Sequence, residues 1–213
     1  MPTLRVTEIF LSLQGESRTV GVPTVFVRLT GCPLRCQYCD TVYAFKGGET
    51  VELADVLATV SGYGVRHVTV TGGEPLAQAS CHALLTALCD AGHEVSLETS
   101  GALDVAEVDP RVSRVVDVKT PGSGECDRNR YANLDHLRPI DQVKFVICDE
   151  ADYLWAKERM QEWNLAARCE VLFSPSHGQQ SPRELAEWIL RDRLPVRFQL
   201  QLHKLLWGEE RGR

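Results

Sequence analysis

Short runs of apolar residues recur along the chain and alternate with segments of helical periodicity. Most of these runs are almost continuously apolar, which is typical of parallel strands that are covered on both faces. The pattern predicts eight strands, at residues 7–13, 25–30, 67–71, 94–98, 114–118, 142–147, 170–173 and 196–200. A parallel sheet is therefore the predicted centre of the fold.

Four other segments place apolar residues at the i, i+3, i+4, i+7 spacing of an amphipathic helix. They begin near residues 53, 81, 150 and 182. Thr50 is the expected N-cap of the first helix, and Gly92 is the expected stop signal of the second. Ser181 and Glu184 form a capping box around Pro182, which predicts the start of the fourth helix. Each helix follows one predicted strand and precedes the next, as in a β/α fold.

The helical pattern is missing between residues 98 and 142, where polar stretches with glycine and proline join the predicted strands. An α/β fold that lacks these crossover helices is expected to form a partial (β/α) barrel, helix-poor on one side, rather than a complete eight-fold barrel. One domain over residues 1–213 suits a chain of this length. Residues 47–48 and 121–139 are its expected mobile loops.

Composition narrows the class of protein. With 44% hydrophobic and 24% charged residues, the chain has the composition of an ordinary globular protein. A net charge of −6 gives no electrostatic reason to expect nucleic acid as a partner. No apolar run approaches the ~20 residues that span a bilayer, and the N-terminus lacks the apolar core of a signal peptide. Eight cysteines without such a signal predict reduced thiols and a cytoplasmic location, and we expect a small-molecule substrate.

Three of the cysteines, Cys32, Cys36 and Cys39, follow one another closely after a predicted strand. One short loop can fold three such thiolates around an inorganic centre. Iron–sulfur clusters usually take four thiolate ligands, so a cluster held by three keeps one iron open for another ligand. A structural zinc site that borrows a fourth ligand from another cysteine or a histidine is the alternative.

The spacing Cys-x3-Cys-x2-Cys, with Tyr38 before the last cysteine, resembles the radical S-adenosylmethionine (SAM) enzymes. The run Thr71-Gly72-Gly73-Glu74-Pro75, which alone would pass as a strand-to-helix turn, resembles the SAM-binding segment of that superfamily. The family of 7-carboxy-7-deazaguanine synthases is similar in three further segments, at residues 10–16, 39–41 and 201–208. This resemblance covers almost the whole chain, from residue 8 to residue 207.

The resemblance implies a partial barrel of the radical SAM type and a carbon–nitrogen lyase that performs a ring contraction. In that reaction 6-carboxy-5,6,7,8-tetrahydropterin becomes 7-carboxy-7-deazaguanine, the core of queuosine and related 7-deazapurines, with loss of ammonia. The implied cofactors are a [4Fe–4S] cluster, SAM and Mg²⁺, and the implied electron donor is a protein such as flavodoxin or ferredoxin. A homodimer is also implied, whereas nucleic acid and membranes are not expected as partners.

Site residues follow from the resemblance, motif by motif. Three cysteines would hold the cluster and one hydroxyl the magnesium ion: Cys32, Cys36, Cys39 and Thr41. Residues in the cluster loop and at the ends of predicted strands would bind SAM: Tyr38, Asp40, Gly73, Glu74, Ser100, Asp117, Lys119, Ser174 and His177. Short N-terminal and C-terminal extensions and two strand positions would bind the pterin: Leu13, Gln14, Gly15, Glu16, Arg28, Thr71 and His203. No side chain is assigned as catalytic, because the radical chemistry belongs to the cofactors.

Residue types alone support some of these roles and leave others open. Arg28 lies within an apolar strand, where an unpaired charge is costly, and its planar fork suits a carboxylate. Gln14 and Glu16 suit the donors and acceptors of an aminopyrimidinone edge, but they would serve equally as caps of a strand end. His203 would pass as a structural histidine without the resemblance.

Two features depart from the family pattern, and two rival functions stay open. Ser17 stands where glycine is usual in the family, and four residues follow Glu209, so a contact from the chain end of some family members is not carried over.

A glycyl-radical activase shares the cluster loop and the Gly-Gly-Glu-Pro run, but in such an enzyme the residues assigned to the pterin would have no role. A metal- or cluster-binding module without catalysis is the rival from another class.

Overall fold

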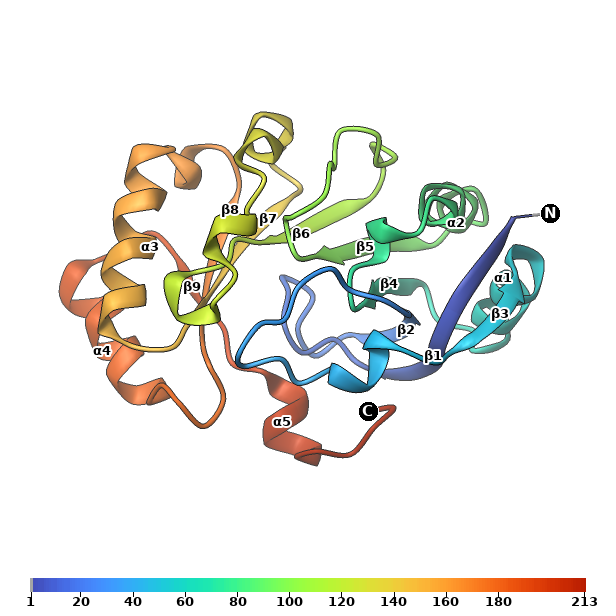
Figure 1. Cartoon of the computed structure of the whole chain (residues 1–213), viewed down its shortest axis with the longest axis horizontal. Helices are drawn as coiled ribbons and strands as arrows, with labels where there is room; N and C mark the ends of the chain where they lie inside the picture. Colours follow the sequence, from blue (N-terminus) through green and yellow to red (C-terminus); the bar gives the residue numbers. More distant parts are fainter. Residues whose placement is uncertain (1) are drawn as a thin grey trace.

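An open sheet of nine strands forms the centre of the computed structural model, which describes residues 2–213 (Figure 1). The strand order is β3-β1-β2-β4-β5-β6-β7-β8-β9, and no ladder joins β3 to β9 among the described residues. From β2 to β9 the strands run parallel, whereas β1 is antiparallel to both of its neighbours. The strands are β1 (Thr3–Leu13), β2 (Pro23–Leu29), β3 (Glu49–Glu52), β4 (His67–Gly72), β5 (Glu94–Thr99), β6 (Ser113–Asp117), β7 (Gln142–Ile147), β8 (Glu170–Pro175) and β9 (Arg197–Phe198). The predicted partial barrel is confirmed.

Four of the five α-helices in the described part of the chain lie where the apolar periodicity predicts them. The helices are α1 (Leu53–Gly62), α2 (Ser80–Asp90), α3 (Glu150–Glu162), α4 (Pro182–Asp192) and, without a predicted counterpart, α5 (Leu202–Trp207). Ser181 accepts a hydrogen bond from the backbone N–H of Glu184, which confirms the predicted cap of α4. The predicted cap of α1 is wrong, because Thr50 belongs to β3 and Glu52 is the residue that precedes the helix.

Three elements differ from the expectation, each for a local reason. The edge strand β3 is four residues long, and its polar composition gives no apolar alternation. The apolar side chains of α5 are exposed, 71% for Leu205 and 50% for Leu206, so the helix has no buried stripe to reveal it. Strand β9 contains two residues instead of the five predicted, because the chain then turns toward the β1–β2 connection, where the Leu202 N–H donates to the Gly15 carbonyl.

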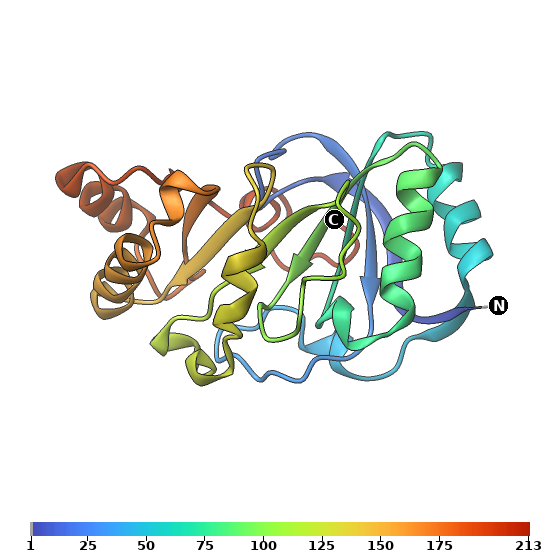
Figure 2. The ribbon, with the colours of Figure 1, turned by 90° about the horizontal axis from the view of Figure 1, so that it is seen from above.

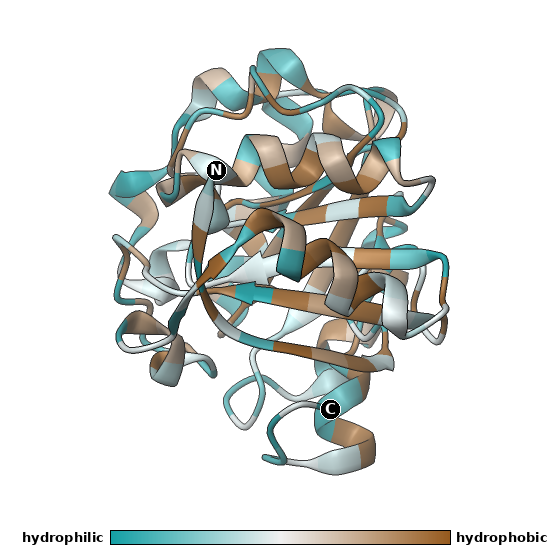
Figure 3. Ribbon diagram, turned by 90° about the vertical axis from the view of Figure 1, so that its right-hand side faces the viewer, coloured by the Kyte–Doolittle hydropathy of each residue, from teal (hydrophilic) through white to brown (hydrophobic). Residues whose placement is uncertain are grey.

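The two faces of the parallel strands differ in polarity, although nearly continuous apolar runs predict two apolar faces. On β4, Val70 is buried against the helices, whereas Thr71 lines the inner wall. On β7, Phe145 is buried in the core and Lys144 faces inward. Helices α1 and α2 cover one end of the outer face and α3 and α4 the other end (Figure 2). Brown, hydrophobic stretches run along the strands and helices in Figure 3, as expected for this outer core.

The connections on either side of β6 contain no α-helix, so the helix-poor side is confirmed for the described residues. A buried carboxylate organises this side instead. Asp141 is fully buried; it accepts a hydrogen bond from the Arg114 backbone N–H at 2.9 Å and forms ion pairs with Arg114 and Arg138 at 2.5 and 3.0 Å. The stretch 121–139 contains three short 3-10 helices, and its mobility stays a prediction. None of the helices in residues 2–213 is long and apolar enough to cross a membrane.

Candidate active site

A cavity of about 450 Å³ lies at the carboxyl ends of the parallel strands, and its wall comes from the sheet, the loop after β2 and α5. Barrel folds place their sites at this end of the sheet. The β1–β2 connection also reaches the wall. The carbonyl of Gly15 accepts hydrogen bonds from the Leu202 N–H and from the Gln199 side-chain amide, each at 3.2 Å. The N-terminal and C-terminal segments therefore meet at one side of the cavity.

The cluster loop, residues 31–41, is held in place by backbone hydrogen bonds to two other segments. The Gly31 N–H donates to the Ala44 carbonyl at 2.8 Å. The Gln37 N–H donates to the Ser123 carbonyl at 3.0 Å, which ties the middle of the loop to the connection after β6. All three cysteines of the loop line the cavity.

Gly73 brings the end of β4 into close contact with the cluster loop. A Cβ at this position would lie 2.3 Å from the carbonyl oxygen of Gly31 and 2.7 Å from the Cβ of Cys32. The N–H of Glu74 donates to the same Gly31 carbonyl at 2.7 Å. Since a side chain does not fit here, glycine at position 73 sets the place of the first cluster cysteine.

The side chain of Glu74 is fully buried and does not line the cavity. Its carboxylate accepts hydrogen bonds from the Leu76 N–H at 3.0 Å, the Thr99 hydroxyl at 2.9 Å and the Ser100 N–H at 2.7 Å. A carboxylate engaged in this way is not placed to hold a ligand. Instead, it fixes Ser100, a predicted SAM contact, at the cavity wall.

Apart from Glu74 and Ser174, every residue predicted for the site lines the cavity. Ser174 is a buried residue of β8, and Ser176, just past the strand end, lines the wall in its place. The Ser176 N–H donates to the Ile147 carbonyl at 2.8 Å, which fixes it beside β7. The structure thus brings together residues from the whole length of the chain.

The three cluster-loop cysteines suit a cluster better than a single zinc ion. A tetrahedral zinc site has Zn–S bonds of about 2.3 Å, which puts its sulfurs about 3.8 Å apart. Among residues 2–213, the group of three metal-ligating side chains whose ligand atoms all lie within 4.8 Å of one another is Glu16, Asp40 and His203, with no cysteine among them. All eight thiols are free, and burial raises the pKa of the three in the loop. Their spacing therefore fits a larger inorganic centre.

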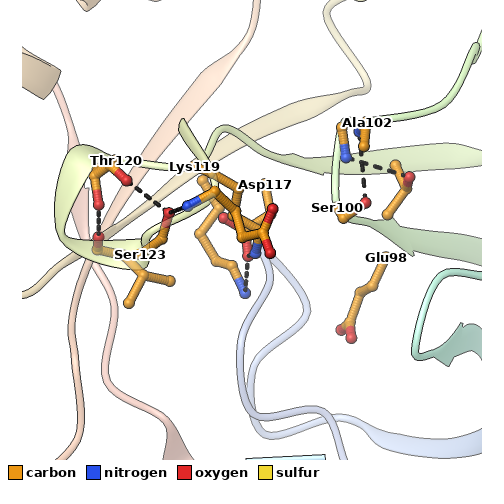
Figure 4. A network of polar contacts seen from close by, with 12 residues as sticks. Glu98, Ser100, Ala102, Asp117, Lys119, Thr120 and Ser123 are labelled. Carbon is orange, nitrogen blue, oxygen red and sulfur yellow. Dashed lines mark hydrogen bonds and ion pairs between the residues drawn. The ribbon is translucent and has the colours of Figure 1, made fainter. Parts of the chain in front are cut away.

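Two buried polar atoms at the wall have no hydrogen-bond partner within the described chain: the Tyr38 hydroxyl and Oδ1 of Asp117. The Lys119 ammonium lies 2.9 Å from the other oxygen of Asp117 and 5.7 Å from the centre of the Tyr38 ring. Figure 4 shows Asp117 and Lys119 together at the end of β6, with Ser100 and Glu98 on the neighbouring β5 side. A polar ligand beside the cluster loop would satisfy both atoms, which fits SAM.

A row of buried charges continues from Asp117 toward the β1–β2 connection. The Lys144 ammonium lies 2.9 Å from Glu16 Oε2 and 3.6 Å from Asp117 Oδ2. Burial raises the pKa of Glu98, and the charge of Glu16 adds to this effect. Burial also acts to raise the pKa of Glu16, but the charges of Lys144 and His203 and the hydrogen bond from Lys144 together outweigh it, and the pKa is lowered. The environment thus pushes the pKa values of two nearby carboxyls apart.

The side chain of Gln14 shapes the turn that presents Glu16. Its Oε1 accepts hydrogen bonds from the N–H groups of Gly15 and Glu16, at 2.7 and 2.9 Å, and its Nε2 donates to the Thr69 hydroxyl at 3.0 Å. Ser17, which replaces the family's glycine, does not adopt a positive φ. Serine is therefore unstrained at this position.

Helix α5 closes the cavity through His203. Its ring nitrogens lie 3.8 Å from Glu16 Oε1 and 3.8 Å from Asp40 Oδ2. Burial acts to lower the pKa of His203, but the hydrogen bond to Asp40 and the charge of Glu16 outweigh it and raise the pKa. The Thr41 hydroxyl donates to Asp40 at 2.6 Å. Thr41 thus offers a hard oxygen beside negative charge, which suits Mg²⁺.

Arg28 is paired within the protein, which explains how the strand tolerates its charge. Its Nε donates to Glu8 Oε1 at 2.7 Å, and the Tyr43 hydroxyl donates to the same oxygen at 2.8 Å. The guanidinium carbon also lies 5.8 Å from the centre of the Phe10 ring. Because the pair uses Nε, the fork of Nη groups can still receive a carboxylate.

Sequence reasoning missed Glu98 and Lys144, both of which line the cavity. Each is a charged residue inside a strand whose alternate positions are buried and apolar. That alternation is the signal which could have found them, because a charge at an inward position needs a partner.

Comparisons with known proteins agree with this site. Residues 26–115 match the model of the radical SAM superfamily. The chain is 47% identical over 210 residues to a 7-carboxy-7-deazaguanine synthase from Chlorobaculum tepidum, covering 97% of this chain and 96% of the relative. It is 42% identical over 222 residues to the same enzyme from Koribacter versatilis, covering 97% and 98%. The crystal structure of QueE from Escherichia coli has the same fold, with a TM-score of 0.72 at 23% identity over 93% of this chain and 94% of that one.

Proposed function

The chain belongs to the family of 7-carboxy-7-deazaguanine synthases within the radical SAM superfamily, and we propose that it catalyses the reaction of that family. The reaction contracts the ring of 6-carboxy-5,6,7,8-tetrahydropterin to 7-carboxy-7-deazaguanine and releases ammonia, in the synthesis of queuosine and other 7-deazapurines. One observation carries the proposal. The three-cysteine loop and the residues predicted to bind the pterin, far apart in sequence, line a single cavity.

The donor groups of the cavity fit the cofactors of this chemistry. Cys32, Cys36 and Cys39 would hold a [4Fe–4S] cluster with one iron open. The Tyr38 hydroxyl and Oδ1 of Asp117, which have no partner in residues 2–213, would meet the polar groups of SAM. When bound, the cluster and SAM supply the one-electron chemistry that removes a hydrogen atom from the substrate. The Thr41 hydroxyl would serve as a protein ligand of Mg²⁺.

The chain's own residues bind and orient the pterin. The Glu16 carboxylate accepts hydrogen bonds from the N–H donors of the aminopyrimidinone edge, and Arg28 receives the substrate carboxylate. Glu98, whose pKa is raised by burial, is suited to hold a proton against the ring. His203 and α5 exclude water from this end of the cavity.

We further propose that a flavodoxin or ferredoxin supplies the electrons, and that the enzyme works as a homodimer in the cytoplasm. Pro33, Arg35 and Gln37 of the cluster loop are exposed, which supports access by an electron donor. The exposed Leu205 and Leu206 support an apolar contact with a second copy. The eight free thiols support a reducing compartment.

The decisive experiment is anaerobic incubation of the reconstituted protein with SAM, a reductant, Mg²⁺ and the carboxytetrahydropterin, followed by mass analysis. We expect 7-carboxy-7-deazaguanine and ammonia in equal amounts. Full substrate recovery from a protein that carries a complete cluster and binds SAM would refute the proposal. Saturable pterin binding separates the synthase from a glycyl-radical activase, and acid-labile sulfide separates both from a zinc module.

A further inference from the structure

Lys144 lies at the junction of the two halves of the cavity. It occupies β7 directly opposite Asp117 of β6 in the parallel register, so both side chains point to the inner face. Its ammonium contacts Asp117 at 3.6 Å and, from 128 residues away in the sequence, Glu16 at 2.9 Å. Only 11% of its side chain is exposed.

The Glu16 carboxylate is held at both oxygens. Lys144 binds Oε2, while the Gln201 side-chain amide donates to Oε1 at 3.1 Å and His203 faces the same oxygen at 3.8 Å. Of these groups, Lys144 brings a permanent positive charge and a strand that is packed into the core. Glu16 itself lies on a connection between strands, so its orientation depends on these contacts.

We propose that Lys144 is a positioning residue that fixes the orientation and the negative charge of Glu16 for recognition of the substrate, with Asp117 on the SAM side as its second anchor. This inference rests on the proposed function, in which Glu16 accepts hydrogen bonds from the aminopyrimidinone edge. A carboxylate that accepts two neighbouring N–H donors must be ionised and aligned with them. Lys144 supplies both conditions before the ligand arrives.

A purely structural ion pair explains the geometry less well. Taking two charges out of water costs several kcal/mol each, and replacement of a buried pair by apolar residues is often neutral or stabilising. The pair lies on the wall of a cavity and not in either hydrophobic cluster. We therefore expect the ion pair to contribute to ligand binding and not to the stability of the fold.

The test is a double-mutant cycle in which the measured quantity is the affinity for fully oxidised 6-carboxypterin. Binding to the anaerobically reconstituted protein is monitored by the fluorescence of this pterin. The variants are Lys144→Met, Glu16→Gln and the double variant. We expect each single change to weaken binding by about tenfold or more, as for a hydrogen bond to a charged group. In the Glu16→Gln background, the further effect of Lys144→Met should be less than about threefold.

Two further variants separate positioning from structure. Lys144→Arg keeps the charge and should recover most of the affinity. Lys157→Met breaks a matched pair outside the cavity, with Asp192 at 2.6 Å, and should leave binding unchanged. Thermal unfolding and iron content are measured for each protein, and Lys144→Gln replaces Lys144→Met if the latter is unstable.

If Lys144→Met and Glu16→Gln lower the affinity independently, so that their effects add in the double variant, Lys144 contacts the ligand directly. That result would overturn the proposal. Unfolding of both neutral variants would also overturn it, because Lys144 would then hold the fold together. An absence of binding by the wild-type protein would refute the proposed substrate instead. Wild-type binding without coupling between Lys144 and Glu16 would refute the positioning role alone.

Discussion

Replacement of Gly73 by alanine tests whether close backbone contact sets the cluster loop. The new Cβ would meet the Gly31 carbonyl oxygen at 2.3 Å, where ordinary contact begins at 3.4 Å. The two segments must therefore separate by about 1.1 Å. The opposing atoms are backbone and the first carbon of Cys32, so no flexible side chain can give way.

The separation should lower both the stability of the fold and the activity of the protein that carries a cluster. The hydrogen bond from the Glu74 N–H to Gly31, now 2.7 Å, would be lost or distorted. Overpacking of this kind typically costs about 1–3 kcal/mol, which lowers the melting temperature by roughly 2–4 °C per kcal/mol in a chain of this size. A shift of about 1 Å at Cys32 should lower turnover on the order of a hundredfold even where a cluster forms.

Gly62→Ala is the matched control, because a Cβ there meets nothing within 4 Å and Gly62 ends α1 without a positive φ. It should keep the cluster and gain about 0.4–1 kcal/mol of stability. Iron and sulfide analysis after anaerobic reconstitution, thermal unfolding and turnover are measured for both variants. A Gly73→Ala protein with a complete cluster and wild-type melting temperature and turnover would refute the reasoning.

Four other changes test separate parts of the site and fold. Cys36→Ala should abolish cluster assembly, whereas Cys81→Ala, in the buried stripe of α2, should keep it; equal iron and sulfide contents would contradict the ligand assignment. Arg28→Lys should weaken binding of 6-carboxypterin by about 1–3 kcal/mol, because an ammonium lacks the fork; unchanged affinity in a fluorescence titration would make Arg28 structural. Thr41→Val should keep SAM binding but lower turnover and flatten its dependence on Mg²⁺; identical rate curves would exclude the hydroxyl as a ligand. Asp141→Ala should lower the free energy of unfolding, measured in urea, by about 3–5 kcal/mol, because it leaves the buried charge of Arg114 unpaired. A decrease below about 1 kcal/mol would show that water replaces the carboxylate.

Periodicity and spacing predict eight of the nine strands described, the four long helices and the cluster loop, because these depend on residues close in sequence. Val68 and Val70, or Leu84 and Leu88, reveal their elements through the face that they bury. Strand β3 and helix α5 bury little, so no local pattern marks them. Their place depends on contacts with distant segments.

The cavity residues divide in the same way. Cys32 and Gly73 belong to motifs that are visible in sequence. The role of Lys144 depends on a partner 128 residues away, and no local pattern joins it to Glu16. The orientation of Glu74, away from the cavity and toward Ser100, likewise depends on how β4 and β5 pair. A motif therefore predicts the presence of a residue at the site more reliably than the direction of its side chain.

The polar inner face of the sheet has a physical explanation in ligand binding and not in folding. Apolar burial under the helices stabilises the strands from outside, through residues such as Val70 and Phe145. At the cavity wall, Lys144, Glu16 and Asp117 lose hydration, and buried charges of this kind can often be replaced by apolar residues without loss of stability. A fold that needed stability alone would be served as well by apolar residues at these positions. Lys144 and Asp117 alternate with core residues along their strands and line one cavity together with Glu16, and we expect the substrate and SAM to bind there.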